Sequence, residues 1–264
     1  MTPARDPGLH ELLSIAEAAA RSAGELLLAR FDEGRGASGE ISSKSTPTDL
    51  VSESDLAAEA VIREILEARR PDDAIMGEEG DDRPGTTGLR WIVDPLDGTI
   101  NFLFGFPVWC VSVACEGVVG VIFDPIRDEL FATPSVEGEP PTCNGIPMRG
   151  SGREDLATTL LATGFGYDSE VRARQVAIIT RVLPEVRDIR RAGSAALDLA
   201  WAAAGRVDAY FEYGVKAWDV AAGRLLCTAA GLDVRELPGG DGLPPGLMAA
   251  PPAVADALRA LLPN

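Results

Sequence analysis

The stretch that decides the fold is RWIVDPLDGTINFLFGF, residues 90–106. Its apolar Trp-Ile-Val start is typical of a strand buried on both faces, and we expect that strand to stop at Asp94. Asp97 then occupies the capping position of a predicted helix, and the backbone N–H groups of Gly98 and Thr99 point outward. Two carboxylates beside such a helix start suit a divalent cation and a phosphate bound together.

The same stretch also has a purely structural interpretation: a strand, an Asp-Pro turn and a capped helix whose aspartates are only solvated. Other acids along the chain have similar alternatives. Asp55 lies in the first turn of a predicted helix, where it favours the helix dipole, and Asp219 has the position of an N-cap. A function therefore depends on how these acids combine, not on any one of them.

The composition limits the available chemistry. The chain has 264 residues, enough for one large domain or two closely joined halves, and His10 is its only histidine. Its four cysteines lack the C-x-x-C spacing of a zinc site, so acid–base or metal chemistry must use oxygen ligands. The formal net charge of −17 argues against a nucleic-acid partner, and it would repel a phosphorylated substrate unless metal ions intervene.

Nothing in the sequence indicates a membrane partner. No uninterrupted apolar run approaches the length of a membrane span, and the first residues lack the pattern of a signal peptide. We therefore expect a cytoplasmic protein.

Helices and strands alternate before the central stretch. Apolar spacing predicts a helix over residues 9–31 and a second helix that ends before residue 71, and the polar, glycine-rich residues 32–48 between them predict a mobile hairpin or loop. Residues 74–80 form a predicted short strand ending on Glu78 and Glu79, only one of which can face a given site. If this strand pairs with the one at residues 91–93, their terminal acids lie side by side, as a two-metal site requires.

After the central stretch, the sequence predicts antiparallel strands and then a mixture of helices and strands. We expect one continuous fold over residues 1–264, with two closely joined halves. Residues 164–167, Gly-Phe-Gly-Tyr, lack the third glycine and the downstream acid of a nucleotide loop, so we discard that interpretation. The predicted elements are strands at 108–114, 118–123 and 129–133, a hairpin or loop at 134–153, a strand at 159–163, a helix at 169–183, a strand at 189–191, a helix between Ser194 and Gly205, a strand at 208–213, a helix from Trp218 to Gly231, a loop at 238–246 and a short final helix.

Taken together, these motifs resemble the inositol monophosphatase family of Mg²⁺-dependent, lithium-sensitive phosphatases. The resemblance covers nearly the whole chain and implies an α/β fold of alternating helix and sheet layers, an αβαβα sandwich, in a homodimer. It rests on Lys44 with Thr48-Asp49 and Asp55, Gly77-Glu78-Glu79, residues 94–102, Gly193-Ser194-Ala195-Ala196, Glu212 and residues 217–223.

The resemblance also implies a set of metal ligands. Glu78, Asp94 and the backbone carbonyl of Leu96 would hold one Mg²⁺, and Asp94, Asp97 and Asp219 a second. A weaker contact through Glu78 would bring the number of ions per site to two or three.

The expected catalytic residues are Glu78, Thr99, Asp55 and Asp97. In the mechanism that the resemblance implies, a water activated by Mg²⁺ is oriented by Thr99 with Asp55 or Glu78 and attacks phosphorus in line. The phosphate oxygens would lie across the metals and on the N–H groups of Gly98 and Thr99.

The resemblance assigns the hydroxyl groups of the substrate to Glu212 and to the Ser194-Ala195 turn. Lys44 is a candidate anion or water contact, with a solvated lysine as the alternative. Lys216 lies where inositol-specific members often carry a residue such as histidine. A cation there would favour a second phosphate or a carboxylate on the substrate, or is simply exposed.

We therefore expect a Mg²⁺-dependent phosphomonoester hydrolase acting on inositol monophosphate, which the continuation Ile100-Asn101-Phe102 favours. Histidinol phosphate, fructose 1,6-bisphosphate and 3′-phosphoadenosine 5′-phosphate stay open as substrates. A regulatory binding protein of the same fold is a further alternative, although such a protein would have no physical reason to retain every ligand.

Overall fold

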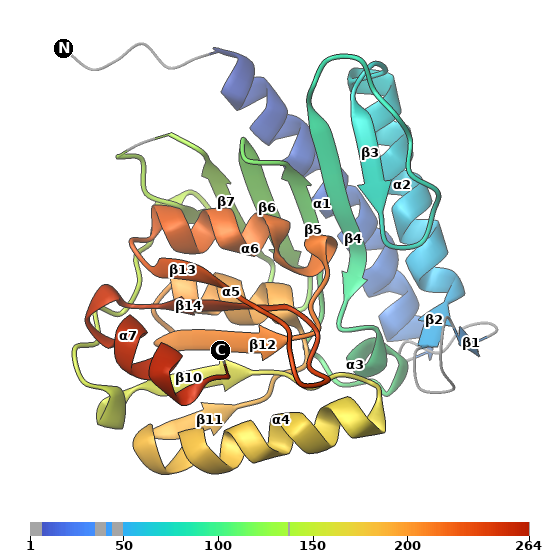
Figure 1. The fold of residues 1–264 in the computed structure, drawn as a ribbon. Coiled ribbons are helices and arrows are strands. Elements are labelled where there is room, and N and C mark those ends of the chain that lie inside the picture. The colour runs from blue at the N-terminus through green and yellow to red at the C-terminus, as the bar shows by residue number, and fades with distance from the viewer. Residues whose placement is uncertain (1–6, 35–40, 44–49, 137, 264) are drawn as a thin grey trace.

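The computed structural model describes residues 7–34, 41–43, 50–136 and 138–263. Helices and sheets alternate in five layers, whose elements are labelled in Figure 1. Lys44, Thr48 and Asp49 lie outside the described residues. No helix in the described ranges is long and apolar enough to cross a membrane.

The N-terminal half of the chain forms the first two layers. Its seven-stranded sheet has the order β3-β4-β5-β6-β7-β8-β9, in which β3 and β4 are parallel and the other neighbours antiparallel. Helices α1 (Pro7–Gly34) and α2 (Glu53–Arg69) cover its outer face, and β1 (Ile41–Ser43) pairs with β2 (Leu50–Ser52) in a separate hairpin. The strands of the sheet are β3 (Ala74–Gly77), β4 (Arg90–Asp97), β5 (Cys110–Cys115), β6 (Val119–Asp124), β7 (Glu129–Pro134), β8 (Thr142–Cys143) and β9 (Ile146–Pro147).

The C-terminal half forms the other three layers. Helices α5 (Ala195–Ala203) and α6 (Ala217–Ala229) lie between the two sheets, and α4 (Ser169–Val182) and α7 (Pro252–Leu261) cover the far face of the second. That sheet has the order β11-β10-β12-β14-β13, with β10 parallel to both neighbours and the other pairs antiparallel. The remaining elements are α3 (Thr99–Leu103), η1 (Leu156–Thr158), β10 (Leu160–Thr163), η2 (Leu183–Glu185), β11 (Asp188–Arg190), β12 (Ala209–Tyr213), β13 (Asp233–Leu237) and β14 (Gly246–Ala250).

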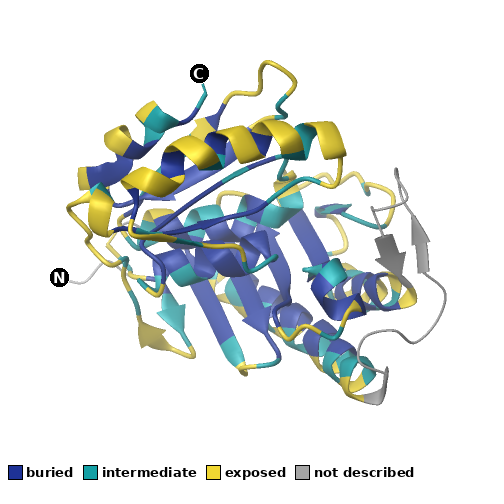
Figure 2. Cartoon of the chain, turned by 90° about the horizontal axis from the view of Figure 1, so that it is seen from below, coloured by how far each residue is buried: buried dark blue, intermediate teal, exposed yellow. Residues whose placement is uncertain are grey.

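Apolar side chains hold the layers together in three clusters. The first joins α1 and α2 to the first sheet, the second places α5 and α6 between the sheets, and the third packs α4 and α7 on the second sheet. Figure 2 shows the resulting pattern, with buried residues on the inner strands and exposed residues on the outer helix faces. The predicted α/β layered fold is therefore confirmed.

Strand β4 runs further than the sequence predicts. It continues through Asp94 to Asp97 instead of stopping at Asp94, and its pairing with β5 shifts register between these two residues. Three steps along β4, from Asp94 to Asp97, match only two along β5, from Ser112 to Cys110. This bulge accommodates Pro95, which has no N–H group to donate to a neighbouring strand.

The predicted caps of two helices are also corrected. Gly98, with φ of 99°, is the N-cap of α3, and Lys216 is the N-cap of α6, so neither Asp97 nor Asp219 is the N-cap residue of its helix. Ser194 does cap α5, because its hydroxyl accepts a hydrogen bond from the backbone N–H of Leu197 at 3.3 Å. Strands β13 and β14 form in a region where the sequence predicts no strand.

We expect Gly120 of β6 to be required for the packing of α6. A Cβ atom at this position would lie 3.0 Å from the Cα and from the carbonyl oxygen of Ala222 in α6. Gly120→Val should therefore lower the free energy of unfolding by about 1–3 kcal/mol, a typical cost of overpacking. Urea denaturation measures this change, and an unaltered midpoint would contradict so close an approach of α6 to the sheet.

Candidate active site

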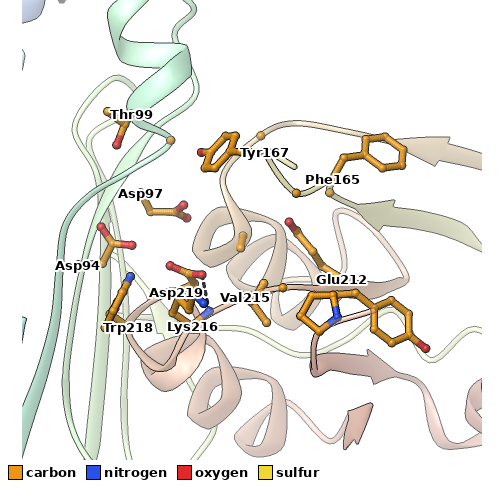
Figure 3. Close-up of a pocket in the computed structure, with 18 of the residues that line it drawn as sticks. Asp94, Asp97, Thr99, Phe165, Tyr167, Glu212, Val215, Lys216, Trp218 and Asp219 are labelled. Atoms are coloured by element: carbon orange, nitrogen blue, oxygen red, sulfur yellow. Dashed lines mark hydrogen bonds between the residues drawn. The ribbon is translucent and has the colours of Figure 1, made fainter. Parts of the chain in front are cut away.

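One cavity of about 540 Å³ is lined by residues of both sheets (Figure 3). Asp94, Asp97 and Asp219 lie at one end of it, and Glu212 lies further along. The predicted site residues that line this cavity are Glu78, Asp94, Leu96, Asp97, Gly98, Thr99, Ala195, Glu212, Lys216 and Asp219.

The parallel pairing of β3 with β4 brings the first two acids together. Gly77, the last residue of β3, pairs with Val93, so Glu78 follows β3 beside Asp94 of β4. This is the arrangement that the sequence predicts for the ends of these strands. Glu78 lines the cavity, whereas the backbone N–H of Glu79 is turned toward helix α2.

Asp94 is a buried carboxyl with like charges around it. Its side chain is almost inaccessible to solvent, and one oxygen accepts a hydrogen bond from the backbone N–H of Leu96 at 3.1 Å. Burial raises the pKa of Asp94 well above its ordinary value, and the carboxylates of Glu78, Asp97 and Asp219 raise it further.

Asp97 is held by the beginning of helix α5. Its Oδ2 accepts hydrogen bonds from the Ser194 hydroxyl at 2.7 Å and from the backbone N–H of Ala196 at 2.6 Å. Burial raises the pKa of Asp97 to about 6, although these two hydrogen bonds act in the opposite direction. In the Ser194-Ala195 turn, to which the resemblance assigns a substrate contact, Ser194 is buried against Asp97 and Ala195 lines the cavity.

Asp219 reaches the cavity from the first turn of α6. Its Oδ2 accepts a hydrogen bond from the backbone N–H of Lys216 at 2.6 Å, drawn as a dashed line in Figure 3. Burial raises the pKa of Asp219 well above its ordinary value, and the Asp97 carboxylate adds to the shift. The Asp219 side chain thus lines the cavity while its hydrogen bond to Lys216 forms part of the capping box of α6.

These carboxylates fit Mg²⁺ in chemistry and in charge. All offer the oxygen donors that Mg²⁺ prefers, and a divalent cation among them would relieve the repulsion that raises their pKa values. As the side chains stand, no three histidine, cysteine, aspartate or glutamate residues in the described part of the chain are gathered tightly enough to enclose a metal ion. The acids would have to draw closer around an ion.

Thr99 and Asp55 form a hydrogen-bonded pair beside the acids. The Thr99 hydroxyl lies 3.0 Å from Oδ1 of Asp55 and 3.1 Å from the carbonyl oxygen of Leu96. A hydroxyl has one hydrogen to donate, so it serves one of these acceptors at a time. Asp55 is completely buried in the first turn of α2, and its contact with Thr99 goes beyond an interaction with the helix dipole.

Glu212 of β12 is a separate acid from the second sheet. The Tyr210 hydroxyl donates a hydrogen bond to its Oε2 at 3.1 Å. Burial raises the pKa of Glu212 to about 7, and the Asp97 carboxylate contributes to the shift. A Cβ atom at Gly164 would lie 2.2 Å from both carboxylate oxygens, so only glycine leaves room for Glu212 in this orientation.

Several lining residues were not identified from the sequence. Phe165 and Tyr167 belong to the Gly-Phe-Gly-Tyr segment that was discarded as a nucleotide loop, and Arg191 and Val215 also line the cavity. The sequence signal for these two residues is their position directly after a predicted strand. Thr163, at the end of that strand, pairs with Phe211, which precedes Glu212 in β12, and this pairing brings the segment to the cavity. Lys216 lies exposed at the rim.

Comparison with known proteins shows the family to which the chain belongs. Residues 8–262 match the inositol monophosphatase family. The chain belongs to this family. Membership implies a metal-dependent phosphatase, in agreement with the acids that face the cavity.

Individual relatives carry names of two kinds. An inositol-1-monophosphatase of Mycobacterium leprae (strain TN) is 40% identical over 283 residues, which cover 98% of this chain and 95% of the relative. The Nus factor SuhB of Escherichia coli (strain K12) is also 40% identical, over 260 residues and 96% of each chain. The solved structure of the extragenic suppressor protein suhB from Bartonella henselae is 35% identical, with a TM-score of 0.85 over 95% of this chain and 98% of that one.

The raised pKa of Glu212 predicts an unusual pH dependence of stability. Between pH 4.5 and 7 the folded state retains a proton on Glu212 that the unfolded chain has lost, so unfolding becomes easier as the pH rises. In the presence of a chelator, we expect this group to lower the free energy of unfolding by about 2 kcal/mol between pH 5 and 8. Urea denaturation at a series of pH values measures the slope.

Two variants separate this effect from general charge repulsion. Glu212→Gln should flatten the decrease, whereas Glu64→Gln on the exposed face of α2 removes the same charge and should leave it unchanged. Equal slopes for both variants would show that Glu212 does not retain the proton.

Proposed function

We propose that this protein is a Mg²⁺-dependent phosphomonoesterase whose substrate is inositol monophosphate. The observation that carries the proposal is one cavity lined by Glu78, with Asp94, Asp97 and Asp219 at one end and Glu212 further along. Family membership and the 40% identity to an inositol-1-monophosphatase support it.

The metal ligands of the proposal are the carboxylates of Glu78, Asp94, Asp97 and Asp219 together with the carbonyl oxygen of Leu96. They would hold two or three Mg²⁺ ions. When bound, Mg²⁺ supplies positive charge for the phosphate and for the leaving oxygen, and it lowers the pKa of a nearby water. The N–H and O–H groups that donate hydrogen bonds to Asp94, Asp97 and Asp219 keep these side chains oriented toward the cavity.

Thr99 and Asp55 orient the attacking water in this proposal. When the Thr99 hydrogen is directed to Asp55, the hydroxyl oxygen is left to accept a hydrogen bond from a water in the cavity. Asp55 can take up a proton by way of this hydroxyl as the water attacks phosphorus. As the phosphorus–oxygen ester bond breaks, the leaving oxygen takes a proton from a water molecule in the cavity, and the proton on Asp55 returns to solvent, so that the products are the alcohol and inorganic phosphate.

Glu212 selects the leaving group. Its carboxyl group is fixed by Tyr210 and by the space above Gly164, and it faces the same cavity as the acids of β4. With a pKa of about 7, it can accept or donate hydrogen bonds with hydroxyl groups near neutral pH. A polyhydroxylated ring such as inositol offers hydroxyls in several directions.

The cations at the rim keep other substrates in consideration. Lys216 is exposed there and Arg191 also lines the cavity, so a substrate with a second anionic group would find positive charge at some distance from the acids. Fructose 1,6-bisphosphate and 3′-phosphoadenosine 5′-phosphate have such a group, whereas inositol 1-phosphate does not. A substrate panel distinguishes these possibilities.

A regulatory role is the second candidate function, because one relative of 40% identity is a Nus factor. In that case the cavity would serve binding instead of turnover. Substitution of Asp94 would then abolish any hydrolysis without affecting the cellular role.

The first test is phosphate release from inositol 1-phosphate, histidinol phosphate, fructose 1,6-bisphosphate and 3′-phosphoadenosine 5′-phosphate, each with Mg²⁺ and with EDTA. We expect Mg²⁺-dependent turnover, highest on inositol 1-phosphate, and a loss of at least about 100-fold in Asp94→Asn because one metal ligand is weakened. Asp72→Asn, an exposed acid outside the cavity, is the matched control. A folded wild-type protein that binds Mg²⁺ but hydrolyses none of the four compounds would refute the enzymatic proposal for this panel.

A second prediction concerns the hydroxyl of Thr99. Thr99→Val keeps the shape of the side chain but removes the group that contacts Asp55, so kcat should fall by about 100-fold while KM changes little. Thr99→Ser retains the hydroxyl and should recover most of kcat. Steady-state kinetics at saturating Mg²⁺ makes the comparison, and equal kcat values for the valine and serine variants would exclude a role for the hydroxyl.

A further inference from the structure

Glu59 is a buried acid of helix α2 that none of the steps above uses. Its side chain is 3% exposed, yet it lies on a helix that covers the outside of the first sheet. Its carboxyl group accepts three hydrogen bonds: from Arg63 Nε at 2.7 Å, from the backbone N–H of Glu79 at 2.8 Å and from the backbone N–H of Gly80 at 2.9 Å. Both oxygens therefore have donors.

Two of these donors belong to the turn that directly follows Glu78. On the other side of Glu78, Gly77 is held by the pairing of β3 with β4 opposite Val93. The backbone of Glu78 is thus fixed on both sides, by the sheet before it and by the Glu59 carboxylate after it. Because Glu78 lines the cavity, the position of this turn determines how far its carboxylate reaches toward Asp94.

The glycines on either side of Glu78 allow this approach. A Cβ atom at Gly77 would lie 2.3 Å from Oε1 of Glu59, and one at Gly80 would lie 2.7 Å from the same oxygen. The Gly-Glu-Glu-Gly sequence therefore provides two adjacent N–H donors and the space for an acid to reach them.

A simpler interpretation is that Glu59 only pairs with Arg63 one helical turn away. That pair accounts for one of its three hydrogen bonds. The other two cross from α2 to residues 20 and 21 positions further along the chain. A pair that served only the helix would not need these contacts.

We propose that Glu59 is a positioning residue that sets the reach of Glu78 into the cavity and so controls the affinity for Mg²⁺. The inference rests on the proposed function only in taking Glu78 as a Mg²⁺ ligand. Glu59 itself does not touch the metal or the substrate. A residue that orients a metal ligand in this way typically changes metal affinity or activity by 10–100-fold when it is replaced, in order-of-magnitude terms.

The test compares Glu59→Gln with the matched control Glu64→Gln, an exposed acid on the same helix. Glutamine retains one acceptor oxygen but places an NH₂ group against an N–H donor, which should displace the turn. We expect Mg²⁺ binding, measured by calorimetry with Mg²⁺ alone, to weaken by about 10-fold in Glu59→Gln and to stay unchanged in Glu64→Gln. The Mg²⁺ concentration for half-maximal hydrolysis should rise by the same factor, with kcat recovering at saturating Mg²⁺.

A second variant covers the case in which Glu59→Gln does not fold. Gly80→Ala leaves the buried acid in place but puts a methyl group against its Oε1, so it should weaken Mg²⁺ binding in the same direction. Wild-type Mg²⁺ affinity in Gly80→Ala or in a folded Glu59→Gln, even with a lower melting temperature, would overturn the inference and assign Glu59 to the fold alone.

The outcome is separable from that of the proposed function. If the wild-type protein hydrolyses none of the phosphomonoesters while Glu59→Gln still weakens Mg²⁺ binding, the enzymatic proposal fails and the positioning role stands. If Mg²⁺ does not bind the wild-type protein, the positioning role is overturned.

Discussion

Repulsion among buried carboxylates is the constraint on which the rest of this structure depends. Burial raises the pKa of Asp94, Asp97 and Asp219, and the carboxylates that surround each of them raise it further. Each is held by a donor from its own neighbourhood or from a helix start, which offsets part of the cost of burial. The beginnings of α5 and α6 must therefore lie beside β4, and this fixes the layer between the two sheets.

The acids themselves could be predicted because their signals are local. Residues 90–106 contain a buried strand with acids at its end, and the apolar run before Glu78 predicts a neighbouring strand, so their proximity follows from pairing. The exact helix caps could not be predicted in the same way. An aspartate at a helix start has a local partner in the sequence, but Asp97 instead accepts hydrogen bonds from residues 97 and 99 positions away.

The second half of the cavity depends on tertiary arrangement. Phe165 and Tyr167 come to the site because β10 lies beside β12, a neighbour that is distant in sequence. Glu59 shows the same limit, since in the sequence it is one of several acids on an amphipathic helix. Its role depends on a turn that packs beneath that helix. Strand β14 was not predicted because its residues adjoin a region rich in proline and glycine.

The hydrogen bond between Ser194 and Asp97 has a consequence for the order in which the chain matures. During synthesis from the N-terminus, β4 leaves the ribosome well before α5 and α6, so about a hundred more residues must emerge before Ser194 can reach Asp97. Contacts of such sequence separation also form slowly, because loop closure precedes any gain from them. Until α5 and α6 dock, Asp97 therefore lacks the hydrogen bonds from Ser194 and Ala196, and Asp94 lacks the nearby carboxylate of Asp219.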